Sequence, residues 1–299
     1  MITSNNGQKW EECYLCGHGK SKYVYLYKGL KQCLSCSFVH YDSIPSTEDL
    51  DLVYSKYTRE EYITDASVSK IRKELSNILN ISKINRVLDI ACGECYFLDV
   101  LQSINPDLEL FATEHSSAKE NVKAKGYNFI EGEFFPITNL TFDLIIFTEA
   151  IEHTNDVNRF LSHASNLLNP GGIIYITTPN FSSLERRLMG EKWGMIMPPE
   201  HLSYFTPKTL EYCMLKNGFK KRYSRTENIS IFRVVEFFNL RFFKSQDPKE
   251  QNLSPQIISD NLQQFVESNF LIRYCKTLIN VFLNLFNLGS SLKAMYQKK

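Results

Sequence analysis

Four cysteines near the N-terminus have the type and spacing to bind a metal ion. Cys13 and Cys16 form one CxxC pair. After sixteen further residues, Cys33 and Cys36 form a second pair. Each CxxC turn directs two thiolates toward one point, so two turns can complete a tetrahedral site. Four protein ligands leave no open coordination position, which predicts structural zinc; unligated cysteines or a redox pair are the alternatives.

Two acids and an imidazole form a second group that could bind a metal ion or catalyse proton transfer. Glu149, Glu152 and His153 fall at positions i, i+3 and i+4 of the segment TEAIEHT, so one helical face would present all three. The trio could bind a divalent cation such as magnesium, or His153 could act as a general base oriented by a carboxylate. His201 in PPEHLSYFTPKTL is a further contributor or an alternative base. The alternative is a capped surface helix whose side chains have no catalytic or binding role.

A turn between a strand and a helix supplies a third candidate site. Residues 86–101, RVLDIACGECYFLDVL, have the pattern of a strand, a turn and an apolar helix. In open α/β sheets, ligands bind beyond the carboxyl ends of strands, near backbone amides at a helix N-terminus. A dinucleotide-binding turn would need glycine at 91, 93 and 96, but only position 93 holds one. The turn from Ala91 to Cys95 occupies that place, so the candidate cofactor contacts are Ala91, Cys92, Gly93 and Cys95.

The elements that must position these residues belong to an alternating α/β pattern. Further strands are expected at residues 108–113, 128–131, 142–147 and 172–177, with helical segments between several of them. This order predicts a parallel, doubly wound sheet. Glu114 lies 25 residues after Asp89, near the spacing at which an acid accepts hydrogen bonds from ribose hydroxyls. A solvated glutamate at a strand end is the alternative for Glu114.

The cysteine-rich segment is too short to build an apolar core of its own. About forty residues bury too little surface, whereas zinc binding contributes on the order of 10 kcal/mol of folding free energy. Residues 23–32, YVYLYKGLKQ, resemble a hairpin that carries the second CxxC pair back to the first. We expect a zinc-binding four-cysteine module over residues 1–45, then a linker and helical lead-in over residues 46–80.

The turn DIACGEC, from Asp89 to Cys95, resembles the fingerprint of class I S-adenosylmethionine-dependent methyltransferases, an acidic residue followed by GxGxG. Cys95 in place of the last glycine adds a side chain where backbone often approaches the cofactor. The segments FDLIIF, NPGG and ITTPN complete the family pattern over residues 86 to about 220. The resemblance implies S-adenosylmethionine as cofactor and a Rossmann-like, mainly parallel seven-stranded sheet. The methyltransferase domain would span residues 81–299.

The resemblance also extends to individual site residues. It assigns Glu133, in EGEFFP, to the neighbourhood of the adenine amino group, and it adds Thr148 to the cofactor site. The ExxEH segment resembles metal-dependent O-methyltransferases of the ubiquinone pathway and of small-RNA 3′ ends, whose acids and histidine hold magnesium against substrate hydroxyls. In relatives without a demonstrated metal, EHxxYF borders the substrate pocket. Trp193, Met195 and Met197 either cover an apolar substrate or pack in the core.

A cysteine module ahead of such a core is similar to zinc-containing methyltransferases of bacterial sugar and surface-polysaccharide pathways. We expect O-methylation of a small hydroxylated metabolite or of a glycan or sugar intermediate. The alternatives are C-methylation of a nucleotide sugar, RNA 2′-O-methylation and a non-catalytic, zinc-anchored scaffold. A dedicated nucleic-acid-binding surface is disfavoured. The chain has 34 Lys and Arg and 33 Asp and Glu, and the resulting net charge of +1 gives little attraction to a phosphate backbone.

The sequence also sets expectations about location and assembly. The N-terminus lacks the basic start and apolar core of a secretory signal, so we expect a cytoplasmic protein. Residues 229–288 are expected to be a largely helical insertion. Within it, residues 270–288 are apolar but carry too many polar groups to span a membrane, so core or interface packing, a weak membrane-surface contact and a homodimer are the expectations.

Overall fold

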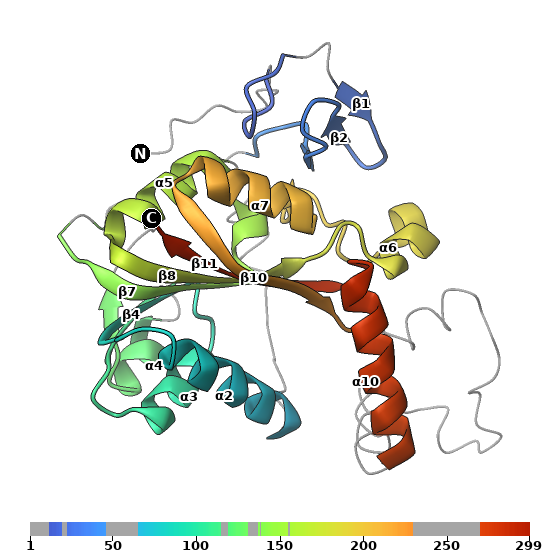
Figure 1. Ribbon diagram of the computed structural model, residues 1–299. Helices are drawn as coiled ribbons and strands as arrows, with labels where there is room; N and C mark the ends of the chain where they lie inside the picture. Colours follow the sequence, from blue (N-terminus) through green and yellow to red (C-terminus); the bar gives the residue numbers. More distant parts are fainter. Residues whose placement is uncertain are drawn as a thin grey trace.

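The computed structural model describes residues 12–19, 23–45, 65–114, 119–130, 137, 139–154, 156–229 and 270–299. Its main body is a seven-stranded sheet in the order β10-β11-β8-β7-β4-β5-β6, with helices on both faces (Figure 1). Strand β11 runs antiparallel to both of its neighbours, and the pairs from β8 to β6 are parallel. The strands are β4 (Arg86–Ile90), β5 (Glu109–Thr113), β6 (Asn128–Ile130), β7 (Phe142–Thr148), β8 (Leu168–Pro179), β10 (Phe219–Glu227) and β11 (Ser291–Lys298).

The helices bury an apolar stripe on each face of this sheet. Residues such as Leu75 and Leu98 pack with Leu144 of β7 on one face, and Leu161 and Leu210 pack with Ile145 of β7 on the other. The central strands are therefore apolar on both sides, as in other buried parallel sheets. The first face carries α2 (Asp65–Leu79), α3 (Tyr96–Ile104) and α4 (Lys119–Ala124), and the second carries α5 (Val157–Leu167) and α7 (Pro207–Lys216) (Figure 1).

The doubly wound, mainly parallel seven-stranded sheet expected from the sequence is confirmed. Local chemistry explains where its helices begin. The side chain of Asp156 accepts a hydrogen bond from the backbone N–H of Arg159, 3.0 Å away, and so caps α5. Thr206 caps α7, with Pro207 at the first helical position, where a missing N–H costs nothing.

The cysteine-rich segment forms a second, smaller sheet that includes a strand from the main body. Its order is β1-β2-β3-β9, and β1 and β2 form the expected antiparallel hairpin. Tyr14 and Ser203 share a hydrogen bond of 2.7 Å, and Lys216 donates to the carbonyl of Leu15 at 2.6 Å. The module is thus built into the main body through a shared sheet. Its strands are β1 (Tyr23–Tyr25), β2 (Leu30–Cys33), β3 (Val39–Tyr41) and β9 (Ser203–Tyr204).

Helix α10 (Phe270–Leu285) lies beside the edge strand β10 (Figure 1). The side-chain oxygen of Asn284 accepts from the backbone N–H of Thr226, and that of Asn280 accepts from Asn228, both at 3.0 Å. The asparagine side of the helix therefore accepts hydrogen bonds from backbone N–H groups at the edge of the sheet. Apolar side chains point away from the sheet and are 42% to 72% exposed, namely Leu278, Ile279, Val281, Phe282, Leu285 and Phe286.

Several expectations fall on parts of the chain that are not described. Residues 230–269 of the expected insertion, most of the linker and Glu133 lie outside the described residues. In the part of the chain that the structure describes, no helix is both long and apolar enough to cross a membrane.

Candidate active site

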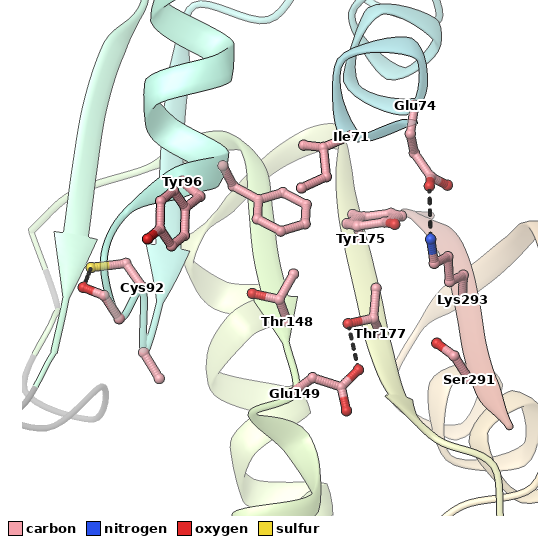
Figure 2. A pocket seen from close by; sticks show the side chains of 13 residues that line it. Ile71, Glu74, Cys92, Tyr96, Thr148, Glu149, Tyr175, Thr177, Ser291 and Lys293 are labelled. Atoms are coloured by element: carbon pink, nitrogen blue, oxygen red, sulfur yellow. Dashed lines mark hydrogen bonds and ion pairs between the residues drawn. The ribbon is translucent and has the colours of Figure 1, made fainter. Parts of the chain in front are cut away.

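A cavity of about 240 Å³ opens where β4, β7 and β8 end. This is the edge of an open α/β sheet at which ligands bind. The cofactor turn forms one wall, and α2 and β11 supply the opposite wall (Figure 2). The lining residues are Ile71, Glu74, Ala91, Cys92, Gly93, Tyr96, Phe97, Thr148, Glu149, Tyr175, Thr177, Ser291 and Lys293.

The turn after β4 keeps a glycine-like backbone although two of its expected glycines are replaced. Ala91 has φ 55° and Cys95 has φ 60°, values that cost a non-glycine residue roughly 1–2 kcal/mol each. Hydrogen bonds from the backbone of residues 91 and 92 to Thr113 hold the turn against the end of β5. A Cβ placed on Gly93 would meet nothing within 4 Å, so open space lies over the turn. Strain retained beside open space is typical of a binding site.

Two acids flank this turn. Glu114 follows β5, and its Oε2 accepts the backbone N–H of Gly93 at 2.7 Å. Asp89, in β4, is 1% exposed, and neither of its carboxylate oxygens has a hydrogen-bond partner in the described structure. Burial, followed by the charge of Glu114, raises the pKa of Asp89 well above its usual range. A buried carboxyl group without a partner beside the turn matches what the ammonium group of a bound amino-acid cofactor would require.

Residues 149–153 do not form the helical face expected from their spacing. The backbone N–H of Glu149 donates to the carbonyl of Thr177 at 3.0 Å, so pairing with β8 continues one residue beyond β7. Glu149 then adopts φ 50°, and only a single 3₁₀ turn, η3 (Ile151–His153), follows. As a result, Glu149 faces the cofactor cavity, where it accepts a hydrogen bond of 2.9 Å from the Thr177 hydroxyl (Figure 2).

Glu152 lies next to this cavity wall and is 2% exposed. One of its oxygens accepts from the Thr178 hydroxyl at 2.9 Å, and the other has no hydrogen-bond partner among the described residues. Burial, and then the charge of Glu149, raises the pKa of Glu152. Glu152, His153 and His201 place one ligating atom each within 4.8 Å of one another. The group of side chains that converges is therefore this one, and Glu149 is not part of it.

The two histidines are oriented by backbone carbonyls. Nδ1 of His153 donates to the carbonyl of Glu200 at 3.0 Å, and Nδ1 of His201 donates to that of Met195 at 2.8 Å. In a neutral imidazole this leaves Nε2 as the accepting nitrogen. Burial lowers the pKa of His201, which favours its neutral form. The rings meet edge to face with centroids 4.9 Å apart. Such nitrogens can accept a proton or bind a cation.

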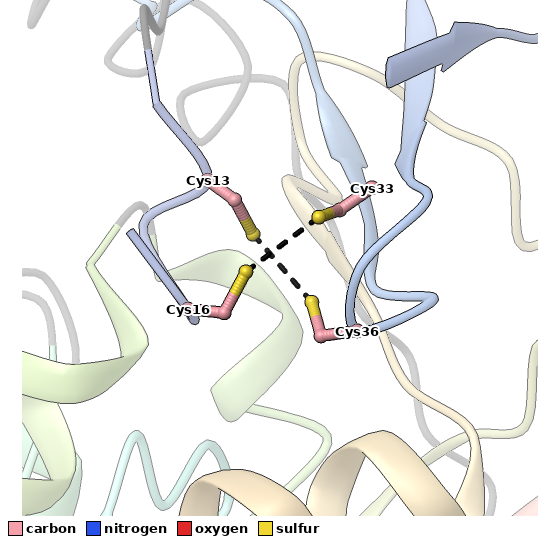
Figure 3. A group of neighbouring side chains, drawn as sticks. All are labelled: Cys13, Cys16, Cys33 and Cys36. Carbon is pink, nitrogen blue, oxygen red and sulfur yellow. Dashed lines mark hydrogen bonds between the residues drawn. The ribbon is translucent and has the colours of Figure 1, made fainter. Parts of the chain in front are cut away.

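The four N-terminal cysteines converge as the sequence predicts (Figure 3). The Sγ atoms of Cys13 and Cys36 are 3.7 Å apart, and those of Cys16 and Cys33 are 3.6 Å apart. A tetrahedron of four Zn–S bonds of about 2.3 Å has edges of roughly 3.8 Å, so these separations fit zinc without rearrangement. The cluster does not contribute to the lining of the cavity.

The structure adds site residues that sequence reasoning missed. Glu74 of α2 is buried and reaches Arg225 at 3.0 Å and Lys293 at 3.5 Å (Figure 2). Tyr223 donates a hydrogen bond of 2.7 Å to the same carboxylate. These residues come from three distant segments, so no local motif could have indicated the cluster. Trp193 is 1% exposed and packs with Leu30 and other residues of the small sheet, which contradicts the lid interpretation for it.

Of the remaining expected cofactor residues, Thr148 ends β7 and lines the cavity, as do residues 91–93. Cys95 is the residue before α3 and is 1% exposed.

Comparison with known proteins gives consistent results. A family described as "Methyltransferase domain" matches residues 59–224. A ubiquinone biosynthesis O-methyltransferase of Bradyrhizobium sp. (strain ORS 278) is 26% identical over 172 residues, covering 53% of this chain and 67% of that protein. A mitochondrial protein of the same description from Dictyostelium discoideum is 29% identical over 149 residues, covering 42% of this chain and 46% of its own length. The alignments thus span about half to two thirds of these relatives.

A solved SAM-dependent methyltransferase from Archaeoglobus fulgidus has a similar fold. It superposes with a TM-score of 0.50 at 16% sequence identity, covering 78% of this chain and 95% of that one. At this identity the similarity concerns the fold.

Proposed function

The chain belongs to the methyltransferase-domain family and has the class I fold of S-adenosylmethionine-dependent enzymes, and from this premise we propose that it O-methylates a small hydroxylated metabolite or a glycan intermediate. The observation that carries the proposal is the cavity at the end of β4. A strained, glycine-like turn with open space over Gly93 lines it, and the buried, unpartnered Asp89 lies in β4 two residues before this turn. The ubiquinone biosynthesis O-methyltransferases among the relatives support a hydroxyl acceptor.

The residues of the turn would bind and orient the donor. S-adenosylmethionine supplies an electrophilic methyl group on a sulfonium. Asp89 offers a carboxylate to its ammonium group, and Glu114 offers one to the ribose hydroxyls. Alignment of the donor with an acceptor oxygen can lower the barrier by about 7–11 kcal/mol, so the pocket needs few reactive side chains.

The group of Glu152, His153 and His201 would accept the proton of the acceptor hydroxyl. We propose that Nε2 of His153 or His201 removes the proton of the acceptor hydroxyl, because each ring is fixed by a hydrogen bond at Nδ1. Magnesium held by this group is the alternative. Two imidazoles and one carboxylate suit a transition-metal ion better than magnesium, which prefers oxygen ligands.

The N-terminal cluster would hold structural zinc. This proposal is supported by sulfur separations that match the edges of a zinc–thiolate tetrahedron. A reducing compartment keeps such thiols available, so the proposal includes a cytoplasmic location.

The outer face of α10 supports a homodimer. Its exposed apolar side chains lie in residues 277–287, a stretch with no charged residue. Helices that lie on membrane surfaces usually carry lysine or arginine along their polar face. In α10, Arg273 and Lys276 are confined to the first half, and the asparagines of the second half bind the backbone of Thr226 and Asn228. An uncharged apolar face therefore favours a second copy of the chain over the weak membrane contact.

The first test is a calorimetric titration of the zinc-loaded protein with S-adenosylmethionine. We expect saturable binding that Asp89→Ala and Glu114→Ala both weaken, with Glu109→Ala, a strand residue away from the cavity, as the matched control. Absence of binding by folded protein would overturn the methyltransferase proposal and support the scaffold. Titrations with and without magnesium, and an acceptor screen that includes nucleotide sugars and short RNA, then separate the alternatives.

A further inference from the structure

A third CxxC pair, Cys92 and Cys95, lies inside the turn after β4. The Sγ atoms of Cys92 and Cys95 are 2.8 Å apart. The backbone N–H of Cys95 donates to the carbonyl of Cys92 at 2.8 Å, which closes a β-turn between them. Such a turn holds its end Cα atoms within about 7 Å, which is close to the upper end of the range that a disulfide spans. The two thiols are therefore placed for direct bonding.

Neither thiol has a role in the metal-ligand groups or in the methyl transfer described above. The groups of metal-ligating side chains found in the described ranges are the N-terminal cluster and the Glu152 group, and neither contains Cys92 or Cys95. The proposed methyl transfer uses no thiol. Cys92 lines the cavity, whereas Cys95 is buried behind it with 1% exposure. A small oxidant can thus reach the pair through the cavity.

We propose that Cys92 and Cys95 form a reversible disulfide on exposure to peroxide, and that this disulfide weakens binding of the methyl donor. The second half rests on the proposed function of the cavity. The first half depends only on the position of the two thiols. The hydrogen bond with Cys95 and burial raise the pKa of Cys92, so the reactive thiolate is scarce at neutral pH and we expect oxidation of the pair to accelerate as pH rises.

The chemistry balances with hydrogen peroxide as oxidant. One sulfur attacks peroxide, forms an S–O bond, breaks the O–O bond and releases water, which gives a sulfenic acid. The other sulfur attacks this sulfenic sulfur, forms the S–S bond and releases a second water. Two thiols lose two electrons and two protons, and peroxide becomes two waters. A dithiol reductant reverses the change by thiol–disulfide exchange.

The disulfide would act on the donor site through the turn itself. Gly93 lies between the two cysteines, and its N–H is bonded to Glu114, the expected ribose ligand. A covalent ring over residues 92–95 holds the turn in this arrangement. The ring fixes the backbone of Gly93 and Glu94, so the turn can no longer shift to accommodate the bound donor. Donor affinity should therefore fall when the pair is oxidised.

The disulfide can be detected separately from the zinc cysteines. Trypsin cuts after Arg86 and Lys119, and the peptide of residues 87–119 contains Cys92 and Cys95 and no other cysteine. We expect mass spectrometry of the peroxide-treated, zinc-loaded full chain to show this peptide two hydrogens lighter, with recovery under dithiothreitol. A peptide that keeps its reduced mass, or that carries only added oxygens, would overturn the proposal.

The effect on the donor site is measured with S-adenosylhomocysteine by calorimetry. We expect about tenfold weaker binding to the oxidised chain, and by linkage about a 30 mV rise in the midpoint potential of the pair when the ligand is saturating. Each protein is compared with its own reduced form. Cys92→Ser should lose the redox effect, and Cys213→Ser, which removes a buried thiol elsewhere, should retain it.

The outcomes separate this inference from the proposed function. Disulfide formation without a change in affinity overturns the regulatory half. A redox effect that persists in Cys92→Ser assigns the effect to other cysteines and also overturns it. If the reduced protein binds no S-adenosylhomocysteine while the disulfide still forms, the proposed function fails and the modification site stands.

Discussion

At the scale of single residues, Asp89 combines a cost to the stability of the free protein with a proposed role in donor binding. Its carboxyl group is buried without a hydrogen-bond partner in the described structure, and its raised pKa reflects that burial. A carboxyl whose pKa is higher in the folded state binds more protons there than in the unfolded chain. Folding stability is then lost as pH rises from the unfolded pKa of about 3.9 toward the folded one.

Removing this charge should therefore stabilise the free protein. We expect Asp89→Asn to raise the free energy of unfolding at neutral pH by about 1–3 kcal/mol, with a smaller gain near pH 5. Thermal unfolding at several pH values measures the change, and Asp107→Asn, in an exposed turn, is the control. The same variant should bind S-adenosylmethionine more weakly. A pH-independent or negative stability change would contradict this account of Asp89.

Donor binding should also release a proton from the same residue. The negative group that opposes ionisation of Asp89 is Glu114. An incoming ammonium group favours the ionised carboxylate and lowers the pKa of Asp89. Affinity should consequently rise with pH until the free-protein pKa is passed. Calorimetry in buffers of different ionisation enthalpy should report proton release, and this release should disappear in Asp89→Asn.

At the scale of elements, local patterns predicted the strands and the turn after β4 well. The run RVLDI became β4 because apolar residues fill both faces of a parallel strand. The helical face at residues 149–153 was wrong, because the spacing does not reveal that Glu149 continues pairing with β8. The cluster of Glu74, Arg225 and Lys293 could not be foreseen, since only the folded sheet brings these segments together.

The four-cysteine module and the main body share an apolar cluster that should report on zinc binding. Trp193 packs with Leu30 and Val39 of the small sheet. We expect removal of zinc by a chelator to unfold residues 12–45 and to expose this indole, which shifts its fluorescence to longer wavelength. The chain has two tryptophans, so the experiment uses Trp10→Phe. A Cys16→Ser variant should show the shift without chelator, whereas Cys213→Ser should not. An unchanged spectrum after confirmed zinc loss would refute the structural role.

At the scale of the whole molecule, the two sheets meet at β9, and the cavity lies at the edge of the larger one. One short segment, residues 201–203, therefore contributes both to the candidate active site and to the sheet of the cysteine module. His201 belongs to the candidate proton-accepting group, and Ser203, two residues later, pairs with β3 of the module. The position of His201 should therefore depend on the four-cysteine module, although its thiols lie outside the cavity.

We propose that the outer face of α10 joins two copies of the chain. Burial of an exposed phenylalanine contributes about 1.5–3 kcal/mol, so pairing of two such helices could support a dimer. We expect sedimentation equilibrium of the full chain to show a dimer, and Phe282→Asp with Phe286→Asp to shift it to monomer because charges would enter the paired face. Ile81→Asp, at an exposed apolar position outside this face, should leave the dimer intact. A wild-type chain that stays monomeric would leave this face unpaired. A chain that binds anionic vesicles through the same phenylalanines would assign the face to a membrane. Either result would contradict the dimer.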